Sequence, residues 1–153
     1  MEAIIASAIA VLGTLLGAGI TLSFQQRTAV KGHQFARAER LRQERLDAYS
    51  AYAGSLINYR RCLVHLWFCL HEHPHEDPGE VRIRAYDLRS IAQESLFRAQ
   101  LLTDDATLSQ DAEAVLAKVT ELYKVDSREE LDERRSGTRD GIRHLVMAAK
   151  RHL

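Results

Sequence analysis

A run of residues without a charged side chain, from Ala3 to Phe24, constrains the fold of this chain more than any other feature. As a helix, these residues would extend about 33 Å, which matches a hydrocarbon core of roughly 30 Å. A cleaved signal peptide would carry a basic segment before its apolar core, whereas only Glu2 is charged ahead of this run. The sequence therefore predicts an uncleaved transmembrane helix over residues 3–24.

Basic residues follow the apolar run and predict its orientation. They are Arg27, Lys31, Arg37, Arg40, Arg42 and Arg45. By the positive-inside rule, the N-terminus lies outside the cell and the C-terminal domain lies in the cytoplasm of a single-pass membrane protein. Residues 25–45 are then a basic juxtamembrane helical stalk close to the lipid surface. The same stalk could contact nucleic acid, but the interleaved Glu39 and Glu44 favour a lipid-facing or solvated helix.

One face of the predicted membrane helix carries small or weakly polar residues. At alternating spacings of four and three they are Ala3, Ser7, Ala10, Thr14, Gly17 and Thr21. Small faces let helix backbones approach closely in lipid, so this oligomerisation face predicts a homo-oligomer. The alternative is that such residues are simply common in membrane spans.

The remaining residues, 46–153, predict an all-α domain that folds as an antiparallel helical bundle. The two prolines of the chain, Pro74 and Pro78, lie in one short His-rich loop. Further breaks are expected at residues 103–105, with Asp105 as an N-cap, and at Ser127, which begins a capping box. Short connections of this kind place successive helices antiparallel.

Apolar residues at helical spacing identify the faces expected to be buried. In the first helix they are Leu46, Tyr49, Ala53, Leu56, Leu63, Trp67 and Leu70, interrupted by Arg60. In the second, from about Glu80, they are Val81, Ala85, Leu88, Ala92, Ser95, Ala99 and Leu102. In the third and fourth they are Leu108, Ala112, Val115, Val119 and Leu122, then Leu131, Thr138, Ile142, Leu145 and Ala149.

Two cysteines and several histidines are the candidates for metal or redox chemistry. Cys62 and Cys69 are too far apart on one helix to form a disulfide with each other. His65 and Cys69 are four residues apart and, with Cys62, could hold a soft metal. Because no second ligand pair such as CxxC accompanies them, a solvated histidine turn beside two buried thiols is the favoured interpretation, and no metal or other cofactor is expected.

No catalytic motif is present. The sequence contains no GxSxG, Walker loop or HExxH, so we expect a protein that is not an enzyme. A formal net charge of zero also disfavours a strongly basic nucleic-acid binder. The aromatic residues of the first helix are expected in its core or in an interface rather than stacked on bases.

Several stretches together resemble a known family. They are residues 11–17 (VLGTLLG), 38–54 (AERLRQERLDAYSAYAG), 59–61 (YRR), 85–89 (AYDLR) and 96–105 (LFRAQLLTDD). This pattern, over roughly the first two thirds of the chain, resembles the actinobacterial KilB family of plasmid-spread membrane proteins. The resemblance implies a membrane protein that takes part in the spread of plasmid DNA and is harmful when its expression is uncontrolled. It brings no catalytic residues.

These observations lead to one main hypothesis and two alternatives. The main hypothesis is a non-enzymatic, self-associating scaffold anchored in the lipid bilayer, which binds protein partners through its cytoplasmic bundle. The first alternative is a metal- or redox-responsive membrane sensor that uses Cys62, His65 and Cys69. The second is a membrane tether for nucleic acid, in which the basic stalk would bind DNA in a salt-sensitive manner.

Overall fold

The computed structural model describes the backbone of residues 2–73 and 77–152, and the side chains of residues 32–73 and 77–152. Within this part of the chain all regular structure is helical. Helix α1 extends over Glu2–His71, α2 over Pro78–Leu101, α3 over Ala106–Thr120 and α4 over Arg128–Lys150, with a short 3₁₀ helix η1 at Leu122–Lys124. The predicted all-α fold class is confirmed.

The chain divides into two compact units, residues 1–41 and residues 42–153. The backbone of the predicted membrane segment, residues 3–24, is helical, but its side chains lie outside the described residues. Among the residues with described side chains, no helix is long and apolar enough to cross a membrane.

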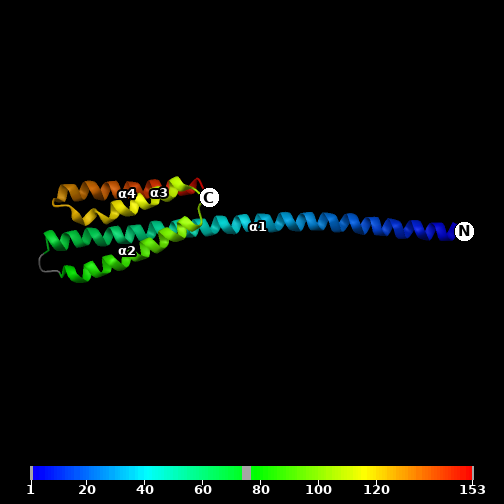
Figure 1. Ribbon diagram of the computed structural model, residues 1–153, viewed down its shortest axis with the longest axis horizontal. Coiled ribbons are helices and arrows are strands. Elements are labelled where there is room, and N and C mark those ends of the chain that lie inside the picture. Colours follow the sequence, from blue (N-terminus) through cyan, green and yellow to red (C-terminus); the bar gives the residue numbers. More distant parts are fainter. Residues whose placement is uncertain (1, 74–76, 153) are drawn as a thin grey trace. The chain divides into compact units, whose positions relative to one another are not determined.

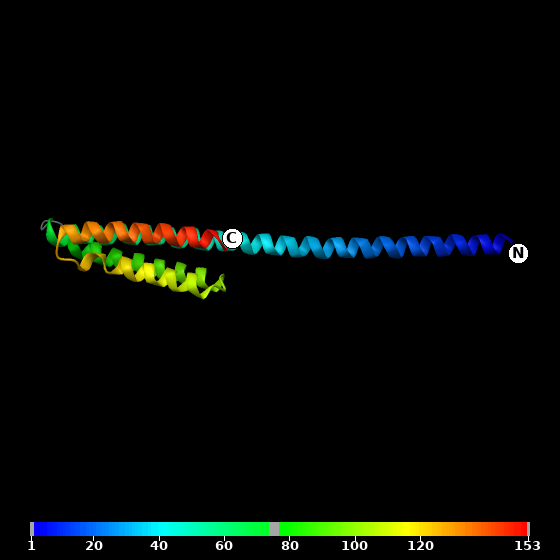
Figure 2. The same cartoon turned by 90° about the horizontal axis from the view of Figure 1, so that it is seen from above.

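Residues 42–153 form a bundle of four antiparallel helical segments. Figures 1 and 2 show the C-terminal half of α1 followed by α2, α3 and α4, each running opposite to the one before it. The connections after α2 and α3 are short, as expected for antiparallel neighbours. The predicted up-down order is thus observed.

Side-chain caps define where the helices of the bundle begin. The Asp105 carboxylate accepts a hydrogen bond from the backbone N–H of Leu108 at 2.9 Å, and the Ser127 hydroxyl accepts one from Glu130 at 3.2 Å. Both caps were predicted. Helix α2 begins two residues before the predicted Glu80, because Asp77 caps it by accepting from the N–H of Gly79 and Pro78 occupies the first turn.

The buried face of α1 is wider than a single apolar stripe. Tyr49, Leu56, Leu63 and Trp67 are buried as predicted. Further buried residues of α1 that the stripe omitted are Ala48, Tyr52, Ser55, Tyr59, Cys62, Leu66 and Cys69. The face is wide because α1 hydrogen-bonds to elements on several sides, including α3, α4 and the segment before α4.

Two residues of the predicted stripe are exposed. Leu46 and Leu70 keep 41% and 42% of their surface in solvent. Leu46 lies at the edge of the buried face, and Leu70 lies in the last turn of α1, beyond which the helix ends at His71. Their predicted burial was wrong.

Tyr52 and Trp67 of α1 are buried, and their polar atoms hydrogen-bond to other elements. The Tyr52 hydroxyl donates to the carbonyl oxygen of Ala112 on α3 at 2.8 Å, and the Trp67 indole N–H donates to that of Val125 at 2.7 Å. Burial raises the pKa of Tyr52, so its hydroxyl stays protonated and able to donate. No buried polar side-chain atom in the described part of the chain lacks a hydrogen-bond partner.

Tyr52→Phe tests this arrangement. The substitution removes the hydroxyl and leaves the Ala112 carbonyl oxygen without this donor, so we expect the free energy of unfolding to fall by about 1 kcal/mol. Trp67, the single tryptophan, allows the bundle to be followed by fluorescence during urea unfolding of the full chain in detergent. Tyr86→Phe is the matched control, because Tyr86 is 65% exposed and should tolerate the change. Equal unfolding midpoints for Tyr52→Phe and the parent chain would contradict the assigned role.

Candidate functional site

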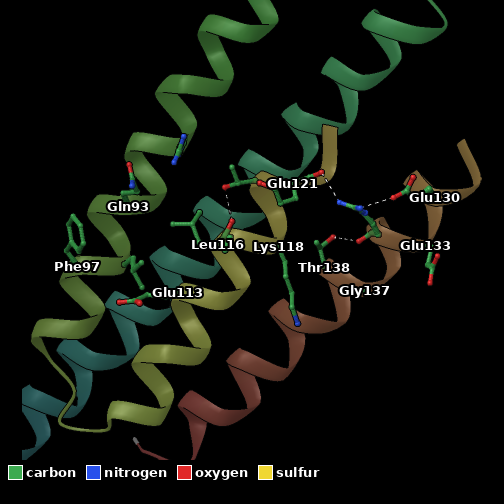
Figure 3. A pocket seen from close by; sticks show the side chains of 15 residues that line it. Gln93, Phe97, Glu113, Leu116, Lys118, Glu121, Glu130, Glu133, Gly137 and Thr138 are labelled. Atoms are coloured by element: carbon green, nitrogen blue, oxygen red, sulfur yellow. Dashed lines mark hydrogen bonds and ion pairs between the residues drawn. The ribbon is translucent and has the colours of Figure 1, made fainter. Parts of the chain in front are cut away.

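An open groove of about 1100 Å³ lies along α3, with α2 on one side and α4 on the other. Figure 3 shows Gln93 and Phe97 on α2, Glu113, Leu116 and Lys118 on α3, and Thr138 on α4 among its lining residues. We call it the lateral groove. It was not predicted, because its lining residues come from three helices and are brought together only by their packing.

The lateral groove has an apolar floor and a charged rim. Leu96, Leu116 and Thr138 are buried, whereas the acidic residues of α3 and α4 at the rim are more accessible. Glu113 accepts a hydrogen bond from Gln100 at 2.6 Å, and Glu130 pairs with Arg134 at 2.7 Å. Such surface pairs contribute little to stability, so the rim can exchange them for contacts with a protein segment.

The lining of the lateral groove combines apolar side chains with carboxylates and cations, among them Glu113, Lys118 and Glu133. The Thr138 hydroxyl donates to backbone carbonyl oxygens of its own helix and accepts from Arg60. Apolar contacts in the floor and ion pairs at the rim are what a docked peptide segment requires.

Arg60 of α1 hydrogen-bonds to α4 beside the lateral groove. Its Nε donates to the Thr138 hydroxyl at 3.0 Å, and its guanidinium donates to the carbonyl oxygen of Arg135 at 2.7 Å. Partial burial lowers the pKa of Arg60, and the nearby cations Arg135 and Arg139 lower it further. In the sequence this residue only interrupted an apolar stripe, whereas in the structure it joins α1 to α4.

Arg60→Met tests this contact. The substitution keeps an apolar side chain of similar length but removes both hydrogen bonds. We therefore expect the free energy of unfolding to fall by about 2 kcal/mol. The measurement is urea unfolding followed by Trp67 fluorescence. Arg61→Met, at the neighbouring exposed position, should leave the midpoint unchanged. Equal effects of the two substitutions would show that the Arg60 contacts do not stabilise the bundle.

The thiol and histidine candidates lie in and beside a second groove, between α1 and α2. Cys62 and His65 line this cavity of about 680 Å³ together with Glu80 and Arg84. The Cys62 thiol is 3.6 Å from the carbonyl oxygen of Val81, and the Cys69 sulfur is 3.7 Å from Nε2 of His65. Both cysteines are buried, and neither forms a disulfide. In the described part of the chain, no three His, Cys, Asp or Glu side chains are grouped so that they could hold a metal ion.

The histidines at the end of α1 make contacts within the bundle. The His71 ring stacks on Trp67 with a centroid distance of 4.4 Å, and its Nδ1 lies 3.0 Å from the Trp67 carbonyl oxygen. The His73 ring lies 6.1 Å from that of Phe68. Asp77 serves as the cap of α2, and His75 lies outside the described residues.

Burial raises the pKa of the Cys62 thiol, since the thiolate would lose its solvation. At pH 8 less of this thiol is ionised than of an ordinary cysteine, so we expect iodoacetamide to modify Cys62 at least about tenfold more slowly than in urea-unfolded chain. The rate should continue to rise with pH beyond the ordinary thiol range. Mass spectrometry of the Cys62 peptide measures both rates.

Modification of Cys62 at equal rates in folded and unfolded chain would contradict its burial. Zinc that stays bound to the full chain through gel filtration and is lost in Cys62→Ser would favour the metal-sensor alternative instead.

The predicted basic residues are only partly described. Arg37, Arg40 and Arg42 are exposed on α1. Arg45 belongs to the bundle, because its Nε donates to the carbonyl oxygen of Leu102 at 2.6 Å. The side chains of Arg27 and Lys31 lie outside the described residues, as do all those of the oligomerisation face, which are Ala3, Ser7, Ala10, Thr14, Gly17 and Thr21.

The described part of the chain is all-helical and carries two grooves. The family model described as KilB plasmid transfer protein matches residues 46–153, and the chain belongs to this family. The match covers the bundle through its last helix and leaves out residues 11–17. The predicted extent of the resemblance, roughly the first two thirds of the chain, was therefore wrong although the family was right. No curated protein and no solved structure matches the chain.

Proposed function

We propose that this chain is a non-enzymatic scaffold of a plasmid transfer system, anchored in the cell membrane and self-associating. One observation carries the proposal: the charge-free run of residues 3–24 continues, within the single helix α1, into the domain that matches the KilB family. A helix of this length and composition can span a bilayer. The family match supports a role in plasmid transfer.

The charge distribution around the run supports a cytoplasmic bundle. Six basic residues follow the run, four of them before the bundle and two in its first turn, and only Glu2 precedes the run. Arg37, Arg40 and Arg42 are exposed, and each basic residue near an anionic leaflet contributes about 1 kcal/mol to binding. The bundle would then be held at the inner face of the membrane.

The bundle supports the scaffold role through its lateral groove. Its floor of Leu96 and Leu116 and its paired charged rim can accept an amphipathic segment of another transfer protein without rearranging the core. The small-residue face of the anchor, centred on Thr14 and Gly17, offers a first contact between copies within the lipid.

A double substitution in the apolar run tests the anchor. Each Arg in the centre of a membrane helix costs about 3 kcal/mol, so Leu12→Arg with Leu16→Arg should move the chain out of the membrane and abolish its support of plasmid transfer. Leu12→Ile with Leu16→Ile is the matched control and should behave as the parent chain. The measurements are the carbonate-resistant membrane fraction and the transfer frequency of a plasmid that depends on this protein.

Two outcomes would contradict the proposal. Parent chain that is extracted by carbonate has no integral anchor. Transfer that persists at full frequency with the Arg variant shows that the anchor does not serve the process.

A further inference from the structure

Helix α2 has a second apolar face on the side opposite its buried residues, and Phe97 on this face also lines the edge of the lateral groove. Its inner face is buried through Ala85, Ala92, Leu96 and Ala99. On the opposite side Ile83, Tyr86, Phe97 and Leu101 are 65%, 65%, 59% and 87% exposed. We call these four residues the outer stripe.

Three residues of the outer stripe follow a coiled-coil repeat, and Leu101 lies beside it. Ile83, Tyr86, Ser90, Gln93 and Phe97 are separated by three, four, three and four residues, which places them on one seam of a helix. Large apolar residues occupy the two ends of this seam and polar residues occupy its middle. A polar residue at the seam of a coiled coil selects one register over others.

We propose that two copies of this chain pair through the outer stripes of their α2 helices, parallel and in register about a twofold axis. This inference rests on the proposed function and deepens it, since it names a second copy as a partner of the bundle and α2 as the contact surface.

The charges beside the outer stripe determine the orientation. Arg82 and Arg89 flank one side of the seam, and Asp87 and Glu94 flank the other. All four are exposed, and none forms an ion pair within the described part of the chain. They are therefore available to a partner helix.

In a parallel in-register pair, a residue on the first flank faces the residue five positions later on the second flank of the partner. Arg82 then faces Asp87 of the second copy, and Arg89 faces its Glu94; twofold symmetry gives each pair twice. In an antiparallel pair each flank faces its own counterpart, so arginines would meet arginines and carboxylates would meet carboxylates. The charge pattern favours the parallel arrangement.

The exposed area also suits a second copy. At roughly 200 Å² for each large side chain, the exposed fractions of the outer stripe amount to about 500 Å². With the stems of the flanking arginines, this approaches the roughly 800 Å² that each partner of a stable complex buries. A parallel pair also places the two bundle ends at Arg42, where the chain enters each bundle, on the same side, as two chains in one membrane require.

Cysteine crosslinking of the full chain in membranes tests the pairing. Ile83→Cys and Phe97→Cys, each alone, should give a disulfide-linked dimer after mild oxidation, because identical seam positions face each other in a parallel pair. The parent chain is the background control, since Cys62 and Cys69 are buried. No dimer at either position would overturn the proposal, as would a disulfide formed only between co-expressed Ile83→Cys and Leu101→Cys chains.

A charge exchange tests the orientation independently. In the Ile83→Cys chain, Glu94→Arg should lower the crosslinked fraction about tenfold. The new arginine would face Arg89 of the second copy, and twofold symmetry repeats this repulsion. Adding Arg89→Glu should restore the dimer. Asp140→Arg on the exposed surface of α4 is the matched control and should change nothing.

Failure of the double exchange to restore crosslinking would overturn the parallel pairing. The same samples report the carbonate-resistant membrane fraction, so loss of the crosslink with retained anchoring rejects this inference alone, whereas loss of anchoring rejects the proposed function.

Discussion

The bundle depends on burying the aromatic face of α1 while keeping its polar atoms bonded. Tyr52 and Trp67 bring large apolar surfaces into the core, and each also brings a donor that is costly to bury unpaired. Their partners are backbone carbonyl oxygens at Ala112 and Val125. These two hydrogen bonds join α3 and the segment before α4 to α1. Arg60 joins α4 to α1 by donating to the carbonyl oxygen of Arg135. The lateral groove follows from this placement.

Much of the fold could be predicted from the sequence because it depends on local signals. The caps at Asp105 and Ser127 are read from a few adjacent residues, and the core stripes of α3 and α4 follow the helical repeat. The width of the buried face of α1 could not be predicted this way, since it depends on how many helices surround it. Ala48, Ser55 and Leu66 were missed for that reason, and Leu46 and Leu70 were wrongly included.

The candidate sites were less predictable than the fold. The lateral groove combines residues from three helices, and Arg60 was recognised only as an interruption, because its partners Thr138 and Arg135 are distant in sequence. The outer stripe has a local signal in the sequence, because apolar residues at helical spacing occur on two faces of α2. Only the inward face was predicted. The flanking Arg82, Asp87, Arg89 and Glu94 would have completed that signal.

The most direct test of a membrane-anchored chain that pairs through α2 is a distance measurement between copies. Full chain with Ser90→Cys would be spin-labelled in lipid nanodiscs and examined by pulsed electron paramagnetic resonance. Since paired helices lie about 8–10 Å apart, the account predicts one short distance between the labels at this seam position. A sample incorporated in the lipid that shows no interaction between labels, or only a broad spread of long distances, would contradict it.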